Sequence, residues 1–307
     1  MSREALAAIL ASGVAMAIPL LLAALGELFA ERAGIINVGL EGMMLVGALA
    51  GVAGAFFGRS PWLGLLAGIL GSMAMAALFA LVAVTRGADQ VVAGTALNLL
   101  ALGATGAAFR SITGRLSEPF IAPAWGPVRV PGLSALPLLG EAFFDRNLLA
   151  YAAYLLVPIA AGLLFHTRWG LMLRAAGENP AAADSMGIEV ARLRWTAILW
   201  GGALAGCGGV FLSIGHVRTF SEDMIAGRGF IALAVVIFGR WSPWGIAAAA
   251  LLFGLAQGVS YSFQALNLRA PYQLFLSLPY LVTLAALVFR GKQSRGPAAL
   301  AQPYRRS

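Results

Sequence analysis

Gly34-Ile-Ile-Asn-Val-Gly-Leu-Glu-Gly-Met-Met-Leu-Val-Gly47 places one amide and one acid inside an otherwise apolar stretch. Four of its fourteen residues are glycines, and they surround Asn37 and Glu41. Glycine weakens a helix, and irregular backbone at membrane depth is tolerated only inside protein or beside water. A carboxylate at that depth is costly unless it is paired or hydrated, so Glu41 is a candidate functional residue. The stretch predicts a broken membrane segment within Gly34–Gly58. A second interpretation stays open, because Glu41 comes early in its run and can simply cap or brace the start of a helix near the membrane surface.

The composition of the whole chain places this stretch in a membrane. Of 307 residues, 60% are hydrophobic and 11% are charged, whereas soluble domains average about 25% charged residues. So few charges do not cover a folded surface that faces water on every side. The composition excludes a soluble globular protein, a disordered chain and a fibrous repeat, and it predicts an all-α, polytopic helical membrane protein.

Apolar runs give the number of membrane segments, because a helix needs about 20 apolar residues to cross the hydrocarbon core. Seven charge-free runs of 20 to 28 residues reach that length: Ala5–Gly26, Ser60–Thr85, Gln90–Phe109, Asn147–Thr167, Trp195–Val217, Trp241–Leu268 and Ala270–Phe289. With the broken segment Gly34–Gly58 and the short run Gly229–Gly239, we expect about 8 to 10 transmembrane segments in one domain, residues 1–290. Charges that flank the runs, among them Glu27 and Glu31, are expected to mark span ends near the membrane surface. Glycines four residues apart, such as Gly202/Gly206 and Gly254/Gly258, predict close helix packing.

Loop charges orient these segments, because Lys and Arg concentrate on the cytoplasmic side. The loop 168–194 has four arginines, and the tail 291–307 is basic, so both are predicted to be cytoplasmic. The connection 111–147 has three arginines balanced by three acids, together with five prolines, and is predicted to be an irregular external loop. Nine crossings then put the N-terminus outside. This distribution accounts for the net charge of +8 without a nucleic-acid partner.

The cytoplasmic loop contains a second informative stretch, Arg174-Ala-Ala-Gly-Glu-Asn-Pro-Ala-Ala-Ala-Asp-Ser-Met-Gly187. Asn179 followed by Pro180 predicts a helix start, with Asn as the N-cap and Pro at the first helical position. Gly187 is suited to end that helix. The result is a two-turn helix with a smooth alanine surface, which suggests a docking element. A simple solvated connector remains the alternative.

Motifs for catalysis are missing from the sequence. Lys292, the single lysine, follows Gly291 but precedes Gln293, so no Gly-Lys-Ser/Thr phosphate loop exists. His166 and His216 are the only imidazoles, and they lie far apart in the sequence. We therefore expect no catalytic residue, no metal site and no cofactor in this chain.

The two quoted stretches together resemble permease subunits of bacterial ABC importers for simple sugars and nucleosides, a group that also includes ribose and branched-chain amino-acid permeases. The stretch 34–44 resembles the start of their second membrane segment. The stretch from Arg174 to Ile188 resembles the cytoplasmic loop by which such permeases dock on their ATPase. Gly227–Gly239 followed by Pro243 also fits the family.

The resemblance implies partners and residue roles. Two permease subunits, identical or related, would form the pathway in the bacterial inner membrane. An external substrate-binding protein would deliver a nucleoside or simple sugar, and separate ATPase subunits would hydrolyse ATP. The ATPase contact would comprise Arg174, Glu178, Asn179, Pro180, Ala182 and Gly187, and the translocation pathway would be lined or supported by Asn37, Glu41 and Asn98. Asn98 can equally form a helix–helix hydrogen bond.

Two other classes remain as alternatives. An ion-coupled secondary transporter would favour buried charges near the membrane centre and inverted repeats with broken helices. Only Glu41 approaches the first feature, and no convincing repeat is visible. An intramembrane enzyme would need a catalytic cluster, which the predicted spans lack.

Overall fold

Seven helices of the structure are long and apolar enough to cross a membrane. The computed structural model describes residues 3–134, 136–265 and 296–304. Within these residues the long helices are α1 (Arg3–Arg32), α2 (Leu40–Gly58), α3 (Pro61–Ala80), α4 (Gln90–Thr113), α6 (Leu148–His166), α9 (Val190–Val210) and α11 (Pro243–Ala265). The predicted all-α membrane fold is confirmed. The predicted span Ala270–Phe289 lies outside the described residues.

Shorter elements connect the long helices. They are α5 (Leu139–Phe144), α7 (Arg168–Glu178), α8 (Pro180–Ser185) and α10 (Arg228–Phe238). The π-helical turns η1 (Leu81–Thr85) and η2 (Phe211–Val217) extend α3 and α9. Two short strands, β1 (Val128–Arg129) and β2 (Asp145–Arg146), pair antiparallel with Val128 opposite Arg146. The loop 111–147 is thus partly ordered.

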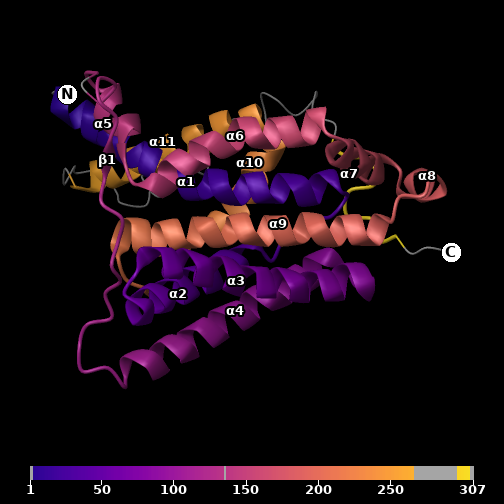
Figure 1. The fold of residues 1–307 in the computed structure, drawn as a ribbon, viewed down its shortest axis with the longest axis horizontal. Coiled ribbons are helices and arrows are strands. Elements are labelled where there is room, and N and C mark those ends of the chain that lie inside the picture. Colours follow the sequence, from indigo (N-terminus) through magenta and orange to yellow (C-terminus); the bar gives the residue numbers. More distant parts are fainter. Residues whose placement is uncertain (1–2, 135, 266–295, 305–307) are drawn as a thin grey trace.

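Helices α1 and α9 run side by side through the middle of the bundle (Figure 1). On one side α2 and α3 pack against α9, and α4 lies beyond them against α2. On the other side α1 packs against α10 and α11. The outer helices α3, α4 and α6 bury only 28 to 33% of their apolar stretches, as expected of helices that face lipid. The buried core therefore centres on α1, α2 and α9.

The two ends of the bundle differ. Figure 1 shows the N-terminus, α5 and β1 at one end, which we call the loop end. Helices α7 and α8 and the C-terminus lie at the opposite end, which we call the tail end. The long connection and the loop 168–194 therefore lie on opposite sides, as the loop charges predict.

Glycines allow the central helices to approach closely. A Cβ atom on Gly206 of α9 would lie 2.8 Å from the carbonyl oxygen of Gly68 on α3. A Cβ atom on Gly258 of α11 would lie 2.5 Å from the backbone nitrogen of Gly13 on α1. The predicted glycine-mediated packing is confirmed at both positions.

Glu27 and Glu31 lie near the end of a span, as predicted, but they are buried inside the protein. Helix α1 continues to Arg32, and both acids lie inside it, 0% and 2% exposed. One oxygen of each carboxylate accepts a hydrogen bond, whereas Oε2 of Glu27 has no partner among the described residues. Glu27 Oε1 accepts from the backbone N–H of Asn37 at 2.8 Å, and Glu31 Oε2 accepts from the indole N–H of Trp241 at 2.5 Å.

Candidate functional site

The candidate site is built around the linking segment, residues 33–39, which joins α1 to α2 without helical structure. This part of the chain is largely buried, so its backbone polar groups need partners inside the protein. Side chains supply them. Gln90 Oε1 accepts from the N–H of Ile36 at 2.8 Å, and the amide of Asn98 donates to the carbonyl of Val38 at 2.9 Å. The predicted break inside the second membrane segment is wrong, because α2 runs uninterrupted from Leu40 to Gly58 and the irregular backbone lies before it, in the linking segment.

Glu41, in the first turn of α2, binds the start of α10. Its Oε1 accepts from the N–H of Gly227 at 2.7 Å, and its Oε2 accepts from the N–H of Gly229 at 2.6 Å. The first N–H groups of a helix lack partners within the helix and carry the positive end of its dipole, so a carboxylate is well suited there. A Cβ atom on Gly229 would lie 2.5 Å from the Cα atom of Glu41, so only glycine permits this approach. The carboxylate therefore joins two membrane helices whose contacting residues are 186 positions apart.

Asn37 and Asn98 form hydrogen bonds within the linking segment and with the first turns of α2. Asn98 Oδ1 accepts from the N–H of Gly42 at 2.8 Å, so Asn98 holds both the linking segment and the first turn of α2. Asn37 is completely buried, and its side-chain amide donates to the sulfur of Met43 at 3.3 Å. All three side chains thus support the break between α1 and α2. Whether they line a solute pathway stays a prediction.

At the tail end, α8 has the local structure that the sequence predicts. The side chain of Asn179 caps the helix by accepting from the N–H of Ala182 at 3.0 Å, and Pro180 is its first residue. Gly187 follows with a φ of +84°, which permits the chain to turn away. Ala183 packs inward, Ala182 faces outward, and Met186 is 83% exposed.

Two residues predicted for the ATPase-docking surface, Arg174 and Glu178, also contact other segments of this chain. The guanidinium of Arg174 lies 5.2 Å from the centre of the Phe165 ring, in a cation–π contact. The exposed Glu178 accepts a hydrogen bond from the N–H of Ala298 at 3.3 Å. Of the residues predicted for the docking surface, Glu178, Asn179, Ala182 and Gly187 are exposed.

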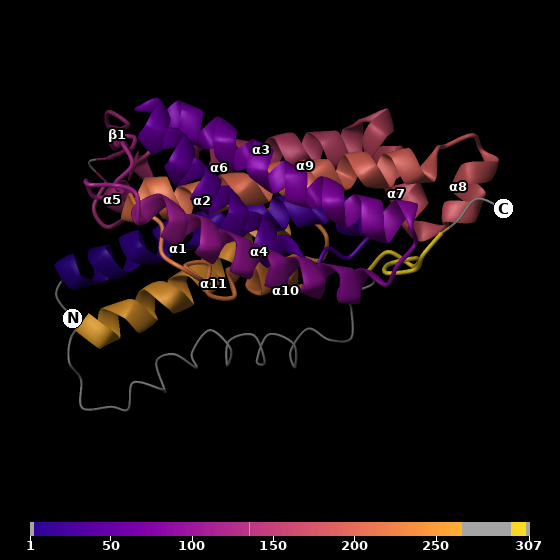
Figure 2. The same ribbon diagram turned by 90° about the horizontal axis from the view of Figure 1, so that it is seen from below.

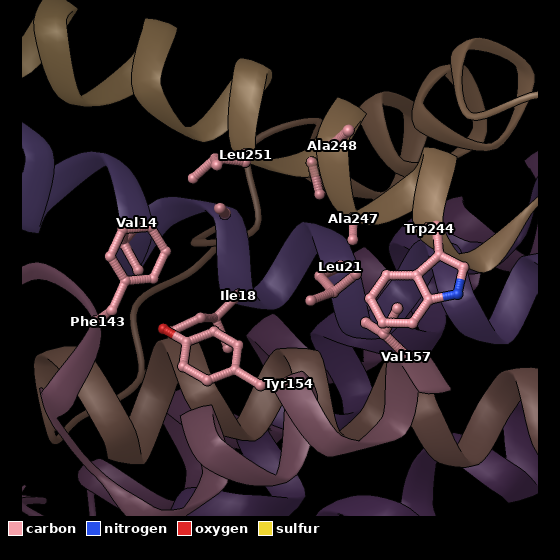
Figure 3. Close-up of a pocket in the computed structure, with 12 residues that line it drawn as sticks. Val14, Ile18, Leu21, Phe143, Tyr154, Val157, Trp244, Ala247, Ala248 and Leu251 are labelled. Carbon is pink, nitrogen blue, oxygen red and sulfur yellow. The ribbon is translucent and has the colours of Figure 1, made fainter. Parts of the chain in front are cut away.

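A cavity of about 380 Å³ lies between α1, α5, α6 and α11. Figure 3 shows the rings of Phe143, Tyr154 and Trp244 around the aliphatic side chains of Ile18 and Leu21. The lining is apolar apart from the Tyr154 hydroxyl and the Trp244 indole N–H. Such a lining suits an apolar group better than a hydroxyl-rich solute.

The sequence profile of one family, the permease component of the branched-chain amino acid transport system, matches residues 9–288. The chain belongs to this permease family. It is accordingly a transport component and not an enzyme. Among the residues that the structure describes, no group of three or more His, Cys, Asp or Glu side chains is placed to hold a metal ion.

Three relatives resemble this permease over most of their length. It is 39% identical to the guanosine ABC transporter permease protein NupQ of Bacillus subtilis, over 98% of this chain and 97% of the relative. It is 39% identical to the nucleoside ABC transporter permease protein NupC of Lactococcus lactis, over 89% of each chain. It is 38% identical to the putative glucose ABC transporter permease protein TsgC13 of Haloferax volcanii, over 98% of each chain.

Sequence reasoning missed four side chains that hydrogen-bond to α1 or to the linking segment. Glu27 and Gln90 accept from the N–H groups of Asn37 and Ile36. Arg194 donates to the carbonyl of Ala33 at 3.0 Å, and Trp241 donates to Glu31. Glu27 and Glu31 are four residues apart and therefore share one face of α1, which was a usable signal for burial against a partner. Gln90 and Arg194 lie at span ends, where polar residues are ordinary. No local pattern indicates that their side chains turn inward.

Proposed function

We propose that this permease imports a small polar solute, most directly a nucleoside, in a complex driven by separate ATPase subunits. The observation that carries the proposal is α8 at the tail end. It is a capped six-residue helix with a smooth outward face and a methionine that is 83% exposed. Met side chains adapt to a partner surface, and a short rigid helix is suited to enter a cleft on that partner.

Charge supports the orientation that this role needs. The loop 168–194, which contains α7 and α8, has four arginines. We therefore place the tail end on the cytoplasmic side of a bacterial inner membrane. The ATPase would then meet α8 where ATP is available. The loop end would face outward and receive solute from an external substrate-binding protein. A second permease subunit, identical or related, would complete the pathway.

The contact of Glu41 with α10 supports a pathway whose helices move during transport. Glu41 fastens α10 to α2 beside the linking segment, and α10 spans only 11 residues, about half a membrane crossing. Short or broken helices that meet at membrane depth are typical of transport pathways. Movement of the linking segment would therefore alter the contact between α2 and α10.

Uptake by a reconstituted complex tests the proposal. The chain is placed in proteoliposomes with its ATPase, a second permease subunit and the binding protein, and labelled guanosine uptake is measured with and without ATP. We expect ATP-dependent uptake that unlabelled nucleosides suppress and glucose does not. Absence of ATP-dependent uptake for every solute tried would contradict the proposal.

A simple sugar is the second candidate solute. The resemblance to the putative glucose permease of Haloferax volcanii, at 38% identity over 98% of each chain, favours it. The same vesicles distinguish the two candidates. Glucose that suppresses labelled guanosine uptake, and that enters in an ATP-dependent manner itself, would favour the sugar.

A further inference from the structure

Residues 296–304, which we call the tail clasp, lie across the tail end beside α7 and α8 (Figure 2). The clasp is tied to two distant parts of the chain by backbone hydrogen bonds. The N–H of Ala299 donates to the carbonyl of Gly177 at 2.9 Å, at the end of α7. The N–H of Ala301 donates to the carbonyl of Gly34 at 3.1 Å, at the start of the linking segment.

Arg194, in the first turns of α9, fixes the clasp on the linking segment. Its side chain is buried, with the residue only 2% exposed. Nε donates to the carbonyl of Ala33 at 3.0 Å, and Nη1 donates to the carbonyl of Gln302 at 3.3 Å. A buried guanidinium is costly without acceptors, so these two carbonyls are important partners of Arg194 and join the clasp to the linking segment.

The backbones at this junction are in direct contact. A Cβ atom on Gly177 would lie 2.2 Å from the carbonyl oxygen of Arg32. A Cβ atom on Gly34 would lie 2.9 Å from Nη2 of Arg194 and 3.1 Å from the carbonyl oxygen of Ala299. Close-packed backbone leaves little room for independent movement, so a displacement of one segment is passed to the next.

The clasp also contacts α8. The hydroxyl of Tyr304 donates to Oδ2 of Asp184 at 3.1 Å, and Asp184 lies on α8. One end of the clasp therefore touches the short exposed helix. Its middle touches Gly34, seven residues before Glu41, whose carboxylate holds α10.

We propose that the tail clasp is a coupling strut, with Tyr304 as a positioning residue that carries displacement of α8 to the linking segment. The proposal rests on the proposed function, because it assumes that an ATPase moves α8. Without the clasp, α8 would be joined to the membrane helices through α7 and through the turn at Gly187, where φ is +84°. Of these attachments, α7 reaches the linking segment where Gly177 packs against Arg32 and Gly34, and the clasp adds a second connection that starts on α8 itself.

Two variants test the strut in the complete transporter. Tyr304→Phe removes one hydroxyl and keeps the ring, and a chain ending at Gly296 removes most of the clasp. Tyr151→Phe is the matched control, because its hydroxyl donates to the carbonyl of Val128 at 2.8 Å at the opposite end of the bundle. For each variant, we measure the ATPase that co-purifies, the ATP hydrolysed and the solute imported per ATP.

A coupling strut predicts a specific pattern. Tyr304→Phe is expected to retain its ATPase and to hydrolyse ATP, while the solute imported per ATP falls by about fivefold or more. For the truncated chain, the solute imported per ATP is expected to fall at least as far. For Tyr151→Phe, this ratio is expected to equal that of the unmodified chain. A merely structural role would lower the amount of folded complex without changing solute per ATP.

The outcomes separate the two proposals. If the unmodified complex shows no ATP-dependent uptake, the proposed function fails. If it imports solute normally and Tyr304→Phe imports the same amount per ATP, the strut proposal is wrong while the proposed function stands. Should the truncated chain not fold, Tyr304→Phe alone decides the matter.

Discussion

Replacing Glu41 with glutamine is expected to loosen α10 from α2. The carboxylate accepts two backbone N–H groups, at 2.7 and 2.6 Å. Glutamine keeps one acceptor oxygen and presents an NH₂ group to the second N–H, so one bond is lost and the other becomes neutral. A hydrogen bond to a charged group contributes about 1.5 to 3 kcal/mol, so we expect a loss of about 3 kcal/mol in the free energy of unfolding.

The assay is thermal denaturation of the detergent-purified chain, followed by the fraction that remains monodisperse on size-exclusion chromatography. At about 2 to 4 °C per kcal/mol, the midpoint should fall by about 6 to 12 °C. Glu189→Gln is the matched control, because its carboxylate is 61% exposed and pairs with Arg192 at 3.2 Å on the surface. Exposed pairs contribute less than about 1 kcal/mol, so this control should shift by only a few °C. Equal midpoints for the two variants would refute the role given to Glu41.

Three further substitutions test other parts of the account. Ala182→Arg places a long charged side chain on the outward face of α8, so we expect lost uptake with an unchanged denaturation midpoint; normal uptake would contradict the docking role. Asn179→Ala removes the side chain that accepts from the Ala182 N–H, so α8 should lose about 1 kcal/mol of helix stability. Less ATPase should then co-purify with the chain, and an unchanged amount would argue against the docking role of α8. Gly209→Ala would put a Cβ atom 2.1 Å from the carbonyl oxygen of Met44, and overpacking of this kind costs about 1 to 3 kcal/mol. Gly162→Ala, where a Cβ atom meets nothing within 4 Å, is its control; similar midpoints for both glycine variants would refute the close approach of α9 to α2.

The sequence was sufficient for features that depend on neighbouring residues. The long apolar runs predicted the spanning helices, because crossing a membrane requires about 20 apolar residues in succession. Asn179 and Pro180 predicted the start of α8, because an N-cap and a first-turn proline act within one turn. Glycines and an acid in an apolar run predicted irregular backbone within Gly34–Gly58, and the structure has it only before Leu40, where α2 begins.

The sequence was insufficient for contacts between distant segments. The carboxylate of Glu41 accepts from the N–H groups of Gly227 and Gly229, and no residue near position 41 in the sequence indicates these donors. Of the two interpretations open for Glu41, the structure places it at a helix start: it lies in the first turn of α2, and its carboxylate binds the first N–H groups of α10. The clasp contacts Gly34 and Gly177 through backbone groups, which leave no signature in side-chain chemistry. The burial of Glu27 was missed for the same reason, since its donor is the backbone N–H of Asn37.

The most direct test of the proposed function is to identify the energy source that drives uptake. Labelled nucleoside uptake is compared in vesicles that contain this chain alone with an imposed proton or sodium gradient, and in vesicles that contain the complete complex with ATP. The account predicts accumulation only in the second case, and its loss when Ala182 is replaced by arginine. Accumulation by the chain alone under an ion gradient would contradict it and would identify an ion-coupled transporter instead.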